Sequence, residues 1–289
     1  QIRESNLQRA NEKRTAAIRC LMMFPLNALV EDQKTRMRKI FCEENGELLQ
    51  SLIQNNRIYF GSYNSNTPVS GSKNNSRFSH LKNTLRQSYE RYLDTKEYCE
   101  QNDEKDYLFY TENFSGGEMW SRFDMQVSPP DILITNYSMM RVMLGRDNEQ
   151  EMLEKTKEWL EEEGNKFTLV LDELHSYRGT SGAEVSYLIK RFLDRLGILD
   201  KPEKLQIICS SASISSDSNE SNLFLEDFFG IDGSSFEIIG DLDPSIEESE
   251  NIDIKEIRNI LEEDYKDLSQ EDLKKLNELL YRHIDSTPT

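Results

Sequence analysis

The sequence predicts an α/β fold in which helices flank a parallel sheet. Short apolar runs alternate with helix-like stretches along the chain, as expected of βα units. One run, Phe167–Leu171, is aliphatic, aromatic or β-branched without alternation, which is typical of a strand buried on both faces of a parallel sheet. Asp172 and Glu173 follow it directly, at the strand end where open α/β sheets bind their ligands.

Five apolar runs predict the strands, in chain order residues 17–24, 57–60, 131–135, 167–171 and 205–210. The spacing of apolar residues predicts helices over residues 2–13, 28–41 and 182–196. Residues 62–79 are rich in Ser, Asn and Gly, which predicts a mobile surface loop, and a charged helix with several tyrosines follows over residues 80–101. We therefore expect one domain over residues 1–240 with a largely helical insertion at about residues 62–130.

The remaining residues, 241–289, predict an acidic linker and a helical hairpin over residues 252–284. Asp217 to Thr289 carries 21 acidic and 6 basic residues, whereas Gln1 to Cys42 carries 4 acidic and 9 basic residues. The formal net charge of −18 therefore does not exclude a nucleic-acid surface in the first part of the chain. The acidic end is an interdomain linker, a mimic of nucleic-acid charge or a solvated hairpin, and base rates favour the last of these.

No run of 18 or more apolar residues occurs, and the polar start of the sequence lacks the apolar core of a signal peptide. We expect an intracellular, cytoplasmic protein without a membrane partner. The four cysteines are widely spaced and form no C-x-x-C pair, which favours reduced thiols over disulfides or a metal site.

Two adjacent carboxylates at a strand tip suit the chemistry of nucleotide hydrolysis. An aspartate there can hold a hydrated Mg²⁺ beside nucleotide phosphates, and the next glutamate can orient or deprotonate the attacking water. The structural alternative is a pair of solvated acids at the end of a strand.

Four stretches in one order resemble the motifs of superfamily 2 DExH-type helicases. DELH (residues 172–175) resembles motif II, MFPLNALVEDQ (residues 23–33) motif Ia, DILITNYSMM (residues 131–140) motif Ib, and SSAS (residues 210–213) motif III. DELHSYRGTSGAEVSYLIKR and GGEMWSRFDMQVSPPDILITNYSMM are more narrowly similar to Lhr-like and MrfA-like bacterial helicases, a group that includes DNA-repair and phage-defence translocases. The resemblance covers about residues 16–239 and implies the first RecA-like motor domain of an ATP-dependent helicase.

The resemblance also assigns roles to residues. Asp172 would hold Mg²⁺ through water and Glu173 would be the catalytic base, while His175 would link the nucleotide site to motif III through Ser211 or Ser213. The residues expected near nucleic acid are Pro25, Asn27, Asp32, Gln33, Thr135, Asn136 and Arg178. The alternatives are a structural histidine, turn and capping roles for the motif Ia and Ib residues, and an ordinary surface arginine.

Trp120 and Arg122 lie in the expected insertion and have two interpretations. They can stack on a nucleic-acid base, or Trp120 can be a packed aromatic of the insertion, which is the favoured reading.

One motif of the family is missing, because no G-x-x-x-x-G-K-[ST] occurs in the sequence. We therefore expect a fragment whose ATP and Mg²⁺ site is completed elsewhere, by the remainder of the polypeptide or a second motor domain, and which is inactive alone. The sheet should be incomplete at the P-loop strand, with the gap filled by rearrangement, another copy or an unrecognised strand. DNA is preferred to RNA as the partner only through the closer resemblance. The alternative is a non-catalytic adaptor that kept a motor fold.

Overall fold

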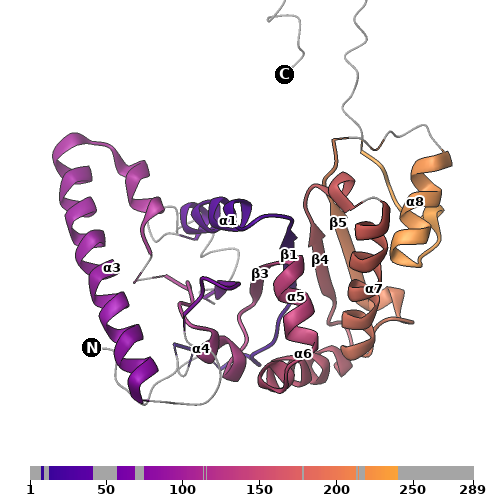
Figure 1. Cartoon of the computed structure of the whole chain (residues 1–289), viewed down its shortest axis with the longest axis horizontal. Coiled ribbons are helices and arrows are strands. Elements are labelled where there is room, and N and C mark those ends of the chain that lie inside the picture. The colour runs from indigo at the N-terminus through magenta and orange to yellow at the C-terminus, as the bar shows by residue number, and fades with distance from the viewer. Residues whose placement is uncertain are drawn as a thin grey trace, which may run out of the picture. The chain divides into compact units, whose positions relative to one another are not determined.

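Five short strands form one sheet in which every neighbouring pair is parallel (Figure 1). The structure is a computed structural model that describes residues 8–9, 13–41, 57–68, 75–112, 114, 116–177, 179–212, 214 and 219–239. The predicted α/β fold is confirmed, and the arrangement is RecA-like. The strands lie across the sheet in the order β2-β3-β1-β4-β5, and their bounds are β1 (Cys20–Phe24), β2 (Phe60–Tyr63), β3 (Ile132–Asn136), β4 (Phe167–Leu171) and β5 (Leu205–Cys209).

Helices connect and flank these strands. The α-helices of the described residues are α1 (Asn27–Ile40), α3 (Asn75–Asn102), α4 (Arg122–Val127), α5 (Tyr137–Leu144), α6 (Gln150–Glu161), α7 (Gly179–Arg195) and α8 (Asn219–Phe229). Short 3-10 helices lie between them: η2 (Lys105–Tyr110), η3 (Asp147–Glu149), η4 (Leu174–Tyr177), η5 (Pro202–Lys204) and η6 (Gly233–Ser235).

The two faces of the sheet carry different core residues because side chains alternate along each strand. On one face, α1 packs on β1, β2 and β3 around a buried cluster that includes Phe24, Val30 and Ile134. On the other face, Leu21 and Leu169 are fully buried, and Phe167 contacts Phe192 of α7 with ring centroids 5.7 Å apart. The faces thus use separate sets of helices.

The prediction that β4 is buried on both faces was wrong for the residues that the structure describes. Thr168 and Val170 are only partly buried, and they pair with Gln206 and Ile208 of β5, of which Ile208 is 49% exposed. The physical reason is that α1 packs on β1, β2 and β3, which lie toward the opposite end of the sheet from β5. The described part of the fold therefore does not completely bury the side chains of β4.

The described sheet is continuous. We expected a vacant strand position that rearrangement, a second copy or an unrecognised strand would fill. Instead β4 pairs with β5 through all five residues, from Phe167 opposite Leu205 to Leu171 opposite Cys209. β2 and β5 are the edge strands of this sheet, and no position between two of the described strands is vacant.

The start of the insertion differs from the prediction. β2 begins at Phe60 and ends at Tyr63, so Ser62 belongs to a buried strand rather than to a mobile loop. Gly61 fits there because a Cβ atom would lie 2.7 Å from Sδ of Met125. The helix expected over residues 80–101 is longer, and it begins at Asn75. Residues 69–74 of the predicted loop lie outside the described residues.

A buried ion pair joins α1 to the insertion. Arg38 on α1 donates two hydrogen bonds to the carboxylate of Glu118, at 2.8 and 2.6 Å, and its third nitrogen donates to the carbonyl of Phe109 at 3.2 Å. Both partners of the pair are at least 95% buried. The helix that follows β1 is therefore held at its carboxyl half by residues far along the chain.

Three arginines surround one carboxylate at the amino end of β3. Arg9, Arg14 and Arg19 all donate to Asp131, which also accepts the backbone N–H of Tyr59 at 2.9 Å. The side chains of Arg9 and Asp131 are 1% and 5% exposed. This arginine cluster ties the residues before β1 and β2 to the start of β3.

Two partly buried thiols, those of Cys20 and Cys209, predict a loss of stability at high pH. Burial raises the pKa of Cys20 to about 11 and that of Cys209 to about 12. An unfolded thiol has a pKa of about 8.5, so the stability contributed by the neutral thiols is complete below that pH and is lost as the pH rises toward the folded values. In urea unfolding, the double substitution Cys20→Ala and Cys209→Ala should reduce the fall in free energy of unfolding between neutral pH and about pH 10. An unchanged fall would contradict this assignment.

The chain divides into a unit of Gln1–Glu237 and a second unit of Ile238–Thr289. The predicted linker and helical hairpin of residues 241–289 lie outside the described residues, as does most of the helix expected over residues 2–13. Among the described helices, none has both the length and the apolar character that crossing a membrane requires.

Candidate functional site

Asp172 and Glu173 follow β4 at the carboxyl edge of the sheet, as the sequence predicts. The backbone N–H of Asp172 donates to the carbonyl of Met23 at 3.1 Å, which ties the acids to the end of β1. Glu173 has a φ of 54°, a left-handed conformation that glutamate rarely adopts. Such conformations cost about 1–3 kcal/mol and cluster at functional sites, so the backbone here is held by its surroundings.

The turn after β5 holds this loop through Ser210. Its Oγ donates to Oδ1 of Asp172 and accepts the backbone N–H of Glu173 at 3.3 Å. Its backbone accepts the N–H of Leu174 at 2.8 Å and donates to the carbonyl of Leu171 at 3.0 Å. The two acids and the SSAS turn are therefore joined directly, and Ser210, which the sequence reasoning did not single out, makes the contacts.

The missed role of Ser210 follows from strand pairing. Leu171 lies opposite Cys209 in the ladder between β4 and β5, so the next residues, Asp172 and Ser210, also face each other. The only signal in the sequence is that each residue comes directly after its strand. Without knowledge that these two strands are neighbours, that signal does not identify the pair.

His175 lies between the acid loop and the SSAS turn. Its Nδ1 is 3.4 Å from the backbone nitrogen of Ala212 and 3.2 Å from Oε2 of Glu173. The two contacts need different forms of the ring, because Nδ1 must be unprotonated to accept from Ala212 and protonated to donate to Glu173. The imidazole can therefore favour the SSAS turn or the glutamate, but not both through the same atom.

The expected partners of His175 are placed only in part. Ser211 is half-buried in the turn beside Ala212, and Ser213 lies outside the described residues. Arg178, expected near phosphate or a partner domain, also lies outside them.

A divalent ion at this edge would have to use few protein ligands. In the described part of the chain, no group of three or more His, Cys, Asp and Glu side chains is placed to hold a metal. Mg²⁺ bound to a nucleotide usually takes only one or two carboxylates, with phosphates and water as the other ligands. The half-buried Asp172 fits that pattern. Burial, and then the charge of Asp172, raises the pKa of Tyr177 above its ordinary value.

The ends of β1 and β3 bring two helix N-termini together. Phe24 lies opposite Asn136 in the ladder, and α1 and α5 begin within three residues of these positions. Asn136 accepts the N–H of Met139 at 2.8 Å as the N-cap of α5 and donates to Oδ1 of Asn27 at 2.6 Å. Neither helix has an acidic residue in its first turn. Paired helix N-termini without their own carboxylates favour an anion such as a phosphate.

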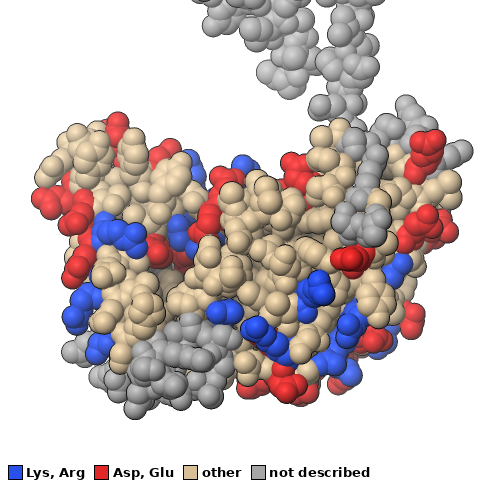
Figure 2. Space-filling model, in the orientation of Figure 1, with Lys and Arg blue, Asp and Glu red and all other residues tan. Residues whose placement is uncertain are grey.

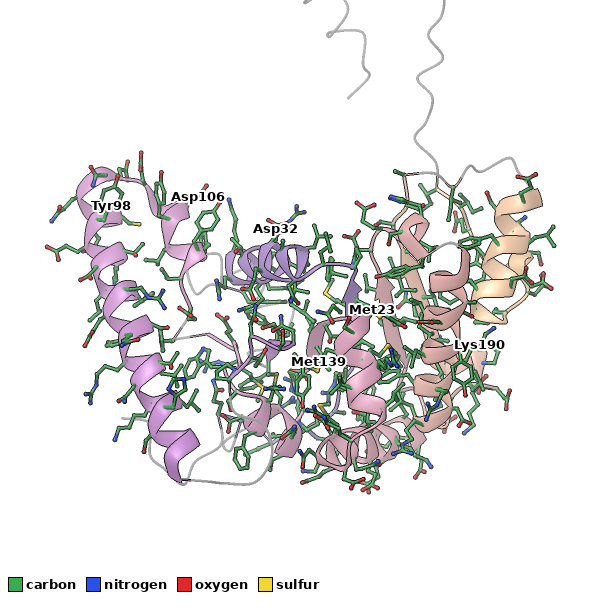
Figure 3. All side chains as sticks on the ribbon, viewed as in Figure 1. Met23, Asp32, Tyr98, Asp106, Met139 and Lys190 are labelled. Atoms are coloured by element: carbon green, nitrogen blue, oxygen red, sulfur yellow. The ribbon has the colours of Figure 1, made fainter. Side chains whose placement is uncertain are left out.

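The other described residues that were expected near nucleic acid differ in their burial and in their partners. Thr135 is fully buried, and its hydroxyl donates to the carbonyl of Tyr63 at 2.7 Å. Pro25 is half-buried at the end of β1, and Gln33 is half-buried on α1. Asp32 lies on the outer side of α1, where it pairs with Arg36 at 2.9 Å (Figure 3). The structure thus brings Asn27 and Asn136 together and leaves Asp32 apart.

Charges of both signs are interspersed on the face drawn in Figure 2, with acidic side chains gathered over the outer end of α3. A phosphate at the ends of α1 and α5 would therefore depend on backbone N–H groups more than on a broad basic surface.

Trp120 and Arg122 pack within the insertion. The Trp120 ring lies 4.9 Å from that of Phe114, and Nε of Arg122 donates to the carbonyl of Thr67 at 2.9 Å. These contacts agree with the packed interpretation rather than with a free platform for a base.

The fold and the site together define a class: a RecA-like α/β domain with paired acids at the carboxyl edge of a parallel sheet. The chain is 32% identical over 279 residues to Druantia protein DruE of Escherichia coli (strain UMEA 4076-1), a match that covers 82% of this chain. The chain spans 15% of the length of that relative. No protein-family profile matches the chain.

Solved structures of one helicase also match. The crystal structure of DUF1998 helicase MrfA matches with a TM-score of 0.39 and 18% identity, over 74% of this chain and 22% of that chain. The structure of MrfA bound to DNA and AMPPNP gives the same TM-score with 19% identity, over 74% of this chain and 19% of that chain. At these values the matches add nothing to the fold assignment, which rests on the topology of the sheet.

Proposed function

We propose that this chain is part of the first motor domain of an ATP-dependent DNA helicase or translocase. The observation that carries the proposal is the placement of Asp172 and Glu173 at the carboxyl edge of β4, where Ser210 joins them to the SSAS turn after the neighbouring strand. Solvated acids at a strand end would not need a left-handed Glu173 or a hydrogen bond to the next strand's turn. The similarity to DruE and the resemblance to DExH motifs support the same class.

In this proposal the acids act on a nucleotide held mainly by residues outside the sequence, which contains no P-loop motif. Asp172 would hold Mg²⁺ through water, and a bound ion would supply positive charge beside the phosphates. Glu173 accepts a proton from the attacking water. His175 exchanges its Nδ1 contact between Glu173 and the turn that contains Ala212, so that the state of the nucleotide reaches the SSAS segment, including Ser211 and Ser213.

The nucleic-acid strand lies across the ends of α1 and α5 in this proposal. Backbone N–H groups of the two helices hold phosphates without reading sequence, and the Asn27–Asn136 hydrogen bond keeps the helix ends together. Pro25 shapes the turn before α1, Gln33 and Asp32 extend the surface along α1, and Thr135 fixes β3 to β2. Arg178 is proposed to touch a phosphate or the partner domain. DNA is the proposed partner, with RNA as an outcome of the test. The pathway that the resemblance implies is DNA repair or phage defence.

The test uses the full-length protein that contains this chain. We expect ATP hydrolysis that single-stranded DNA stimulates at least severalfold, and no hydrolysis by the 289-residue chain alone. RNA, tested in parallel, shows which of the two nucleic acids stimulates hydrolysis. Full-length protein that hydrolyses no ATP with either nucleic acid would contradict the proposal.

The second candidate is a non-catalytic adaptor that binds protein or nucleic acid, and the absence of a G-x-x-x-x-G-K-[ST] motif favours it. The encoding reading frame discriminates between the two. A Gly-Lys-Thr loop shortly before Gln1 supports the motor, and a start codon near Gln1 supports the adaptor.

A further inference from the structure

One side-chain contact connects the two proposed sites across the surface of the domain. The hydroxyl of Tyr137 donates to Oε2 of Glu184 at 2.7 Å. Tyr137 is the first residue of α5 and follows the N-cap residue Asn136 directly, and Glu184 lies in the second turn of α7, the helix after the acid loop. The contact therefore links α5, which begins at the proposed nucleic-acid site, to α7, which follows the acid loop.

Glu184 is linked to the acid loop through short, closely packed backbone. η4 follows Glu173 directly, contains His175 and ends at Tyr177. A Cβ atom at Gly182 would lie 1.9 Å from the carbonyl oxygen of Tyr177, so only glycine allows α7 to approach η4 this closely. A displacement of the acid loop is therefore expected to move the first turns of α7 and Glu184 with it.

Tyr137 is linked in the same way to the ends of α1 and α5. The side chain of Asn136 caps α5 at Met139 and donates to Asn27 at the start of α1. α5 also packs on β3 and on α7, and Met139, which is buried, lies in the middle of the molecule in Figure 3. A ligand that shifts the start of α5 would move Tyr137 relative to Glu184.

The contact is exposed to water and is therefore easily made and broken. The hydrogen bond to Glu184 raises the pKa of Tyr137 above its ordinary value, and Arg141 opposes that shift. Like an ordinary tyrosine, Tyr137 is protonated at neutral pH and can donate. An exposed hydrogen bond contributes little to folding, so its removal should leave the domain folded.

We propose that the Tyr137–Glu184 hydrogen bond is a positioning contact that couples occupancy of the nucleic-acid site to the acid loop. The inference rests on the proposed function, because it assigns one route by which DNA stimulates hydrolysis. It concerns two residues that touch neither the nucleotide nor the acids. With DNA bound, the contact holds α7 and η4 in the arrangement in which Glu173 is active; without it, the two helix ends move independently.

The experiment measures ATP hydrolysis by the full-length protein with and without saturating single-stranded DNA. Tyr137→Phe and Glu184→Ala should each lower the stimulation by DNA about three- to tenfold, the factor that a net hydrogen bond of about 1 kcal/mol supports. The rate without DNA should stay at the parent value. Glu184→Gln keeps an acceptor oxygen and should retain most of the stimulation.

A double-mutant cycle separates coupling from two independent defects. Tyr137→Phe combined with Glu184→Ala should be no worse than either single variant, because both remove the same interaction. Tyr187→Phe is the matched control: it removes a hydroxyl from a 62% exposed tyrosine one turn further along α7 and should behave as the parent.

The outcomes distinguish this inference from the proposed function. Parent-level stimulation in Tyr137→Phe, or an equal fall in the rates with and without DNA, would overturn the positioning role while leaving the motor intact. A parent protein without DNA-stimulated hydrolysis would remove the proposed function and this inference together.

Discussion

Glu173→Gln in the full-length protein should lower DNA-stimulated ATP hydrolysis by at least about 100-fold, the usual contribution of a general base. The amide has nearly the shape of the carboxylate but cannot accept a proton from water. The backbone N–H of residue 173 would still donate to Ser210, so the loop should keep its conformation. Binding of a nonhydrolysable ATP analogue should persist within a few-fold, since Glu173 is not proposed to hold the phosphates.

Glu203→Gln provides the control for Glu173, because Glu203 is an exposed acid in η5, immediately before β5. It should hydrolyse ATP at the parent rate. Asp172→Asn should instead raise the Mg²⁺ concentration needed for half-maximal hydrolysis, which separates the two acids by role. Equal rates in the parent and in Glu173→Gln would remove Glu173 from its assigned role.

Asp131→Asn should destabilise the chain by about 3 kcal/mol, because it leaves buried guanidinium charge without its counter-ion. Arg9 is the most affected partner, since its side chain is 1% exposed, whereas Arg14 and Arg19 are 29% and 24% exposed and can turn toward water. Asparagine keeps the size of the side chain and one acceptor oxygen for the N–H of Tyr59. The measurement is the free energy of unfolding in urea.

Asp106→Asn is the matched control for Asp131. Asp106 pairs with Lys39 at 3.3 Å, and both side chains are more than half exposed, so water replaces the pair at little cost. Its unfolding midpoint should equal that of the parent within error. A loss in Asp131→Asn no larger than the loss in Asp106→Asn would show that the arginine cluster does not hold the amino end of the sheet.

The sequence predicted β4 at its observed bounds because the run has no charged residue and stops at two acids. The predicted range of β2 begins and ends three residues before the observed strand. Gly61 and Ser62 have low strand propensity, and only pairing with β3 makes them part of a strand. The local sequence pattern is therefore enough to predict a strand such as β4, whose composition is typical of strands. A strand such as β2, whose composition is not typical, depends on pairing with its neighbour.

The parts of the site that sequence reasoning missed are contacts between segments far apart in the chain. Ser210 faces Asp172 only because β5 lies beside β4, and Tyr137 reaches Glu184 only because α5 packs on α7. The three arginines converge on Asp131 from more than 110 residues away. Periodicity and motif spacing carry no information about such pairs, so they required the fold.

In the proposed motor, Asp172 and Glu173 form half of a metal–nucleotide site. The most direct measurement is a structure of the full-length protein with a nonhydrolysable ATP analogue and Mn²⁺, in which the ion is located by its anomalous scattering. We expect the ion at about 4 Å from a carboxylate oxygen of Asp172, the distance that one bridging water gives, with Glu173 facing the terminal phosphate. A nucleotide and ion bound away from the carboxyl edge of β4 would contradict it.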